Sequence, residues 1–113
     1  MKTSELSGAA LDWAVAKCEF SGCEGWDETL SGVDAVSDME GKVFSPSTNW
    51  MQGGPIIERE KLWVEPTDDG EQWWSTTLSG RHEGEGTTPL IAAMRCYVAS
   101  KLGDEVEIPE ELQ

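Results

Sequence analysis

The side chains that could hold a metal are few and widely spaced in this sequence. They are a single histidine and three cysteines: His82, Cys18, Cys23 and Cys96. None of them follows the ligand spacing of a zinc site, and a lone histidine in a glycine-rich segment is most often solvated. We therefore expect no metal site and no other cofactor.

Catalysis also lacks its usual residue patterns. Cys96 follows Arg95, and a neighbouring cation can lower the pKa of a thiol, but a cysteine in the middle of a helix is usually a packing residue. Among 22 acidic residues, no pair of carboxylates can be singled out for acid–base work. Gly53-Gly54-Pro55 is neither a Walker loop nor a dinucleotide fingerprint, because no Lys-Ser/Thr pair follows it. We predict a protein that is not an enzyme and has no catalytic residues.

A binding site is the chemistry that remains, centred on residues 45–54, which we interpret as an irregular loop. This segment gathers hydroxyls, amides, an indole and two glycines, whose backbone N–H groups a ligand can approach closely. Two arginines are added because basic residues are scarce in the chain. The predicted ligand-binding residues are Ser45, Ser47, Thr48, Asn49, Trp50, Gln52, Gly53, Gly54, Arg59 and Arg95.

The two most prominent members of this set have alternative interpretations. Trp50 is either a core residue or a platform on which a base stacks. Arg95 lies in an otherwise apolar helix and must find a partner. That partner is either an acid such as Glu58 or Glu60, or the phosphate or carboxylate of a ligand. A nucleotide-like ligand would combine indole stacking with arginine and backbone N–H contacts.

The charge balance limits the partners that the protein can have. Eight Lys and Arg face 22 Asp and Glu, so the net charge is −14 and the pI is near 4.2. Direct binding of nucleic acid relies on cationic side chains and is disfavoured, as is adhesion to an anionic membrane. The acidic surface either serves solubility or docks on a basic protein, for example by imitating DNA.

Two helices must position these residues. Thr88 is a good N-cap, Pro89 suits the first helical position and Gly103 suits the end, so we predict a largely buried helix over Thr88–Leu102. Apolar spacing predicts a second helix over Ser7–Glu19, packed against the first.

On the Ser7–Glu19 helix, the same spacing places Asp12 and Glu19 on the outer side. Phe20–Lys42 has little periodicity and is interpreted as mostly loop, with Trp26 as an anchor.

Two strands are expected between the helices. Ile56–Val64 and Gln72–Leu78 flank the turn signal Thr67–Gly70 and predict a β-hairpin. Gly80–Gly86 is interpreted as a polar connector. In the acidic tail after Gly103, two apolar residues form an edge strand or pack on the core; they are Val106 and Ile108. The predicted fold is α+β in one domain, 1–113, with two helices on a small antiparallel sheet and long irregular loops.

Compartment and assembly are also predicted from composition. No apolar run is long enough for a membrane span, the opening lacks the layout of a signal peptide, and an odd number of cysteines indicates free thiols. We expect a cytoplasmic protein. Six tryptophans in 113 residues exceed what a small core needs, and tryptophan is favoured at interfaces, so we expect a homodimer.

Three blocks, Lys2–Glu19, Phe44–Glu60 and Thr88–Leu112, resemble the NinX-type proteins of tailed phages and prophages. The resemblance covers about two thirds of the chain, and Gly22–Lys42 and Thr67–Gly86 lie outside it. The family is a domain of unknown function. The resemblance therefore implies a phage accessory protein made in the host bacterial cytoplasm, and it supplies no catalytic residues.

Together these observations predict a non-enzymatic binding module. In the preferred interpretation it sequesters a small nucleotide-like signalling molecule and so counters host defence. In the alternative it is an acidic inhibitor of a basic host protein.

Overall fold

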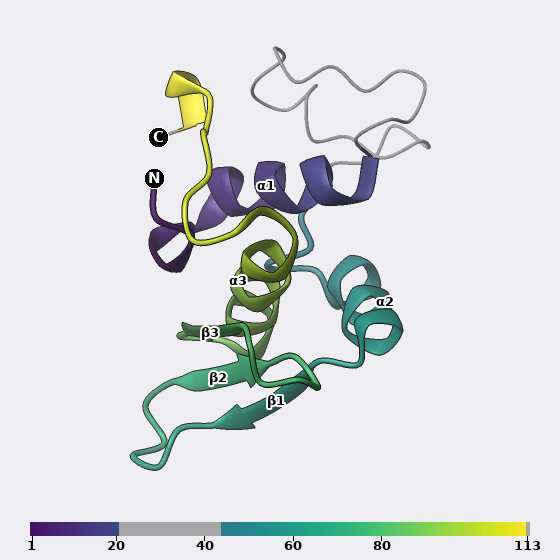
Figure 1. The fold of residues 1–113 in the computed structure, drawn as a ribbon, viewed down its shortest axis with the longest axis vertical. Coiled ribbons are helices and arrows are strands. Elements are labelled where there is room, and N and C mark those ends of the chain that lie inside the picture. Colours follow the sequence, from purple (N-terminus) through teal and green to yellow (C-terminus); the bar gives the residue numbers. More distant parts are fainter. Residues whose placement is uncertain (21–43, 113) are drawn as a thin grey trace.

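A computed structural model describes residues 1–20 and 44–112 and has an α+β fold, as predicted (Figure 1). The long loop expected over Phe20–Lys42, with Trp26, lies almost wholly outside the described residues. The described helices and strands are the 3-10 helices η1 (Thr3–Glu5) and η3 (Glu110–Leu112), the α-helices α1 (Gly8–Phe20), α2 (Trp50–Glu60) and α3 (Pro89–Leu102), and the strands β1 (Trp63–Pro66), β2 (Trp73–Thr76) and β3 (Glu83–Gly86).

The helix α3 is the centre of the fold and has the predicted boundaries. Thr88 Oγ1 accepts the N–H of Ile91 at 3.1 Å, Pro89 opens the helix, and Gly103 ends it with φ of 88°. In Figure 1, α3 lies between α1 and the sheet, with α2 beside it. Most of its side chains are buried among these elements, which explains its uniformly apolar sequence.

The helix α1 packs on α3 as expected, but its two acids do not point outward. Asp12 is only 7% exposed, and its Oδ1 accepts the backbone N–H of Ser47 at 2.9 Å. Glu19 bonds to Arg59 and Tyr97 on the neighbouring helices. The prediction of an outer acidic side was wrong because the turn before α2 and the end of α2 pack against that side of α1.

The segment Ile56–Val64, predicted as a strand, is mostly helix. Asn49 starts α2 because its side chain accepts the N–H of Met51 at 2.9 Å. Lys61 ends the helix in the left-handed region, with φ of 55°. Only from Trp63 is the chain extended. The weak alternation of apolar and charged residues was misleading because the helix buries only a narrow face, which includes Ile56.

The sheet confirms the predicted hairpin and adds a strand. It is antiparallel in the order β1-β2-β3, with Trp63 opposite Thr76. The segment interpreted as a polar connector, Gly80–Gly86, contains β3. A Cβ on Gly84 would lie 2.4 Å from the carbonyl oxygen of Ala92 in α3. Glycine is therefore required where β3 packs directly on the helix backbone.

The tail after α3 returns to the N-terminal segment. Val106 and Ile108 are buried in the core, so packing, rather than an edge strand, is the correct alternative. The amino group of Met1 donates to the carbonyl of Val106 at 2.9 Å, and Lys2 forms an isolated bridge with Glu105. Within residues 1–20 and 44–112, no helix is long and apolar enough to cross a membrane.

Candidate functional site

The predicted binding loop, residues 45–54, is a turn followed by the first turn of α2. Its polar groups bond largely to one another. The N–H of Ser45 donates to Gln52 Oε1 at 2.6 Å, and the hydroxyl of Thr48 donates to the carbonyl of Ser45. Asn49 caps α2 through its side chain, and its carbonyl accepts the N–H groups of Gln52 and Gly53. The backbone donors expected to meet a ligand are therefore occupied by the helix start.

The two glycines of this segment play different roles. A Cβ on Gly53 would lie 2.4 Å from the carbonyl oxygen of Pro46 and 2.6 Å from Leu90 Cδ2. Gly53 thus permits close packing of α2, and it is buried. No atom lies within 4 Å of a Cβ on Gly54. The side chain at Trp50 is 57% exposed, so its interpretation as a core residue was wrong.

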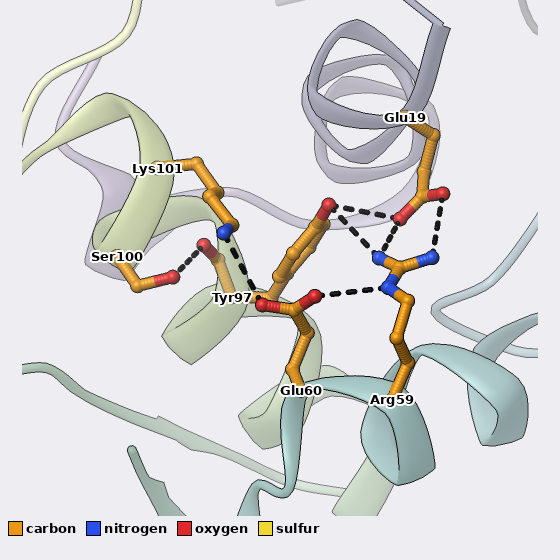
Figure 2. A network of polar contacts seen from close by, with 6 residues as sticks. All are labelled: Glu19, Arg59, Glu60, Tyr97, Ser100 and Lys101. Carbon is orange, nitrogen blue, oxygen red and sulfur yellow. Dashed lines mark hydrogen bonds and ion pairs between the residues drawn. The ribbon is translucent and has the colours of Figure 1, made fainter. Parts of the chain in front are cut away.

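Arg59 belongs to a polar network that joins three helices (Figure 2). Its Nη1 donates to Glu19 Oε2 at 3.1 Å and its Nε to Glu60 Oε2 at 2.9 Å. Tyr97 Oη donates to Glu19 Oε1 at 2.8 Å, and Lys101 Nζ lies 3.2 Å from Glu60 Oε1. The network fixes the end of α2 against α1 and α3.

The protonation states of this network follow from its contacts. The hydrogen bond from Arg59 is the main cause that lowers the pKa of Glu60. Burial, then the hydrogen bond to Glu19, raises the pKa of Tyr97. Two cations thus face two carboxylates and a neutral phenol, so the guanidinium of Arg59 is already neutralised within the protein.

Arg95 bonds to backbone carbonyls rather than to the predicted acid. Its Nε donates to the carbonyl of Leu6 and its Nη1 to the carbonyl of Glu85, each at 2.7 Å. The expected partner Glu60 instead contacts Arg59 and Lys101. Burial lowers the pKa of Arg95.

The guanidinium of Arg95 also borders a hollow of about 200 Å³. The residues that line this hollow are Lys2, Thr3, Ser4, Glu83, Arg95, Ala99, Asp104 and Glu105.

The ten predicted site residues do not meet in one place. Trp50 and Arg59 lie at opposite ends of α2, about 13 Å apart along its axis. Arg95 and Tyr97, which contacts Arg59, are separated by about 200° around α3. The two arginines therefore lie on different sides of that helix. Whether any of the ten residues binds a ligand stays a prediction.

The cysteines that the structure describes are not activated. Cys96 is buried and its thiol donates to the carbonyl of His82 at 3.6 Å. Burial raises the pKa of Cys96, so the neighbouring Arg95 does not produce a reactive thiolate. Burial also raises the pKa of Cys18, to about 12. In the described part of the chain, no group of three or more His, Cys, Asp or Glu is arranged to hold a metal.

The sequence prediction missed a surface on the sheet, which we call the outer sheet face. Residues opposite one another on paired strands share a face. Two such rows face away from α3: Trp63, Thr76 and Glu83 form one, and Glu65, Trp74 and Glu85 form the other.

Burial confirms the assignment of this face. Gly84 and Ser75, which belong to the intervening row, are buried toward α3, whereas Glu65, Glu83 and Glu85 are exposed. Trp63 is 58% exposed, and Trp74 Nε1 donates to Glu83 Oε2 at 3.3 Å. No described element covers this face in Figure 1. The signal in the sequence was the alternation Glu83-Gly84-Glu85-Gly86, which places both acids on one side of a strand.

Comparison with known proteins finds one family. A family model described as "Bacteriophage P22, NinX" matches residues 2–101 of the chain. Most of the described structure lies within this range, including all three α-helices and the sheet except for the last residue of α3. No curated protein matches the chain.

Proposed function

The chain belongs to the NinX family of phage proteins, and we propose that it acts in the infected cell by binding a basic host protein. It works in the host bacterial cytoplasm as a non-enzymatic accessory protein that blocks its partner and so helps the phage against host defence. Binding alone is sufficient for this role.

The observation that carries this proposal is how the charges are distributed. Three of the scarce basic side chains are engaged within the fold: Arg59 and Lys101 with acids, and Arg95 with carbonyls. The acids Glu65, Glu83 and Glu85 instead point outward on one face. With a net charge of −14, the surface attracts a cationic protein and repels nucleic acid and anionic lipid.

The chemistry of the described residues supports binding rather than catalysis. Cys96, the nucleophile considered above, is buried with a raised pKa. Tyr97 is held in the network of Figure 2, and its pKa is also raised. Neither group is poised to ionise near neutral pH, as a nucleophile or general base would be.

The test is retention of host proteins by the purified, immobilised full chain. We expect a basic host protein to be retained at low ionic strength and released as salt rises, because exposed charges are screened over about 10 Å at 0.1 M salt. The retained protein is then purified and its affinity measured by calorimetry. If no basic protein is retained at low salt, the proposal is wrong.

A second candidate function is supported by the hollow beside Arg95. Arg95 and Lys2 supply cations for an anionic ligand group. However, about 200 Å³ is below the roughly 300–1,000 Å³ of typical small-molecule pockets, and three acids also line the space: Glu83, Asp104 and Glu105. A nucleotide-like signal is therefore the less favoured ligand.

The second candidate is tested with extracts of infected, defence-active cells. The protein is incubated with the extract, re-isolated and denatured, and the released small molecules are identified by mass spectrometry. Sequestration predicts a retained anion that is lost in Trp50→Ala or Arg95→Lys variants of unchanged thermal stability. No retained molecule, or retention unchanged in both variants, contradicts it.

A further inference from the structure

We propose that the outer sheet face recognises arginine side chains of an extended basic segment, with Trp74 as the central platform. This inference rests on the function proposed above and names the surface and the partner chemistry. It starts from the arrangement of tryptophans and glutamates across the three strands.

The register of the sheet builds a recognisable cation site. Glu65 and Glu85 lie directly opposite Trp74 on its two neighbouring strands. Side chains opposite one another have Cβ atoms about 5 Å apart, so a carboxylate stands on each side of the indole. A guanidinium above Trp74 would stack on the ring and accept a carboxylate contact from either side.

The second row extends the same pattern. Trp63 lies diagonal to Trp74 on β1, and Glu83 holds the Trp74 indole by its hydrogen bond at 3.3 Å. That bond orients the ring while leaving Trp63 exposed for a second cation. Tryptophans and acids therefore alternate over the face, and a basic segment lying across it could place one arginine on each ring.

Arginine is favoured over lysine by this geometry. The planar guanidinium stacks on an aromatic ring and bonds a carboxylate through two N–H groups at once. The ammonium of lysine is a more strongly hydrated point charge and makes neither contact as well. A face of indoles flanked by carboxylates offers both contacts together.

Two other occupants fit this face less well. A second copy of the chain would place Glu65, Glu83 and Glu85 against the same three acids, and like charges across an interface are strongly unfavourable. Acids on edge strands also serve to prevent sheet-to-sheet association. Two indoles left between those acids work against that purpose, because exposed apolar surface promotes association.

The experiment uses three fluorescein-labelled decapeptides in which glycine alternates with arginine, lysine or citrulline. Citrulline keeps the shape of arginine without its charge. Binding to the full chain is followed by fluorescence anisotropy at low salt. We expect the arginine peptide to bind at least about threefold more tightly than the lysine peptide, and the citrulline peptide to bind at least tenfold more weakly than the arginine peptide.

The decisive variant is the pair Glu65→Gln and Glu85→Gln, which keeps the size of both side chains. It should weaken binding of the arginine peptide about fivefold, within the range of two exposed ion pairs. The matched control changes net charge equally at exposed acids away from the sheet: Glu58→Gln with Glu107→Gln. That control should weaken binding by less than twofold. Trp74→Leu, checked for its fold by circular dichroism, should weaken binding about threefold.

The outcomes separate this inference from the proposed function. If both glutamine pairs weaken binding equally, or arginine and lysine peptides bind alike, the outer sheet face is not an arginine site. A retained host protein would still support the proposed function in that case. If the arginine peptide binds as expected but no basic host protein is retained, the site stands and the proposed function fails.

Discussion

The packing of β3 directly on α3 predicts that Gly84→Ala strongly destabilises the fold. The added Cβ would lie 2.4 Å from the carbonyl oxygen of Ala92 and 2.5 Å from the backbone nitrogen of Cys96. Both atoms belong to the backbone of the central helix, so no side chain can rotate away. Overpacking of a core typically costs about 1–3 kcal/mol, and we expect about 3 kcal/mol here.

Gly54→Ala is the matched control for this substitution. Gly54 is also a single glycine in a regular element, but no atom lies within 4 Å of a Cβ placed there. Alanine in a helix is favoured over glycine by about 0.5–1 kcal/mol, so this variant should be more stable than the parent. The two substitutions add the same methyl group and are predicted to have opposite signs.

Urea unfolding followed by circular dichroism measures both effects. A domain of this size is stabilised by roughly 5–15 kcal/mol, so the Gly84→Ala protein should still fold. Its melting temperature should fall by about 10 °C, and that of Gly54→Ala should rise by about 2–4 °C. If Gly84→Ala unfolds within about 0.5 kcal/mol of the parent, the close contact of β3 with α3 is wrong. Equal losses in both variants would contradict the distinction between the two glycines.

Three further predictions concern buried acids, the helix network and assembly. Burial raises the pKa of Asp12 above 3.8, so its stabilising contribution is lost as pH rises through that raised value. Asp12→Asn, which keeps an acceptor for Ser47, should be at least as stable at pH 7 by urea unfolding, whereas Asp12→Leu should lose about 1–3 kcal/mol. The lowered pKa of Glu60 means the opposite sign. Glu60→Gln should lose up to about 1 kcal/mol above pH 4.5, and a pH series should show that difference vanish below it. The expected homodimer should sediment at twice the 12.4 kDa chain mass at tens of micromolar, and a monomer there would refute it.

The parts of the fold that were predictable from the sequence are those set by local chemistry. Thr88, Pro89 and Gly103 mark the ends of α3 because capping depends only on neighbouring residues. The turn between β1 and β2 was predictable for the same reason. The strand β3 was not, because Gly84 is required by contact with α3 and carries none of the usual preference for strands.

The candidate site was harder to predict because it depends on pairings between distant segments. Arg59 was correctly singled out as unusual, but its partner Glu19 lies 40 residues earlier in the chain. The loop 45–54 has the composition of a binding loop, yet Asn49 uses it to start a helix. The outer sheet face could be recognised only once the register placed Glu65 and Glu85 on either side of Trp74.

The most direct test of the central claim is site-specific photo-cross-linking in infected cells. A photoreactive amino acid is placed at position 63, on the outer sheet face, or at position 51, where the side chain is 86% exposed on α2. We predict an adduct from position 63 to a basic host protein through a peptide that contains arginine, and loss of that adduct when Glu65 and Glu85 are both replaced by glutamine. An equal yield from position 51, or no adduct from position 63, would contradict the claim that this face binds a basic partner.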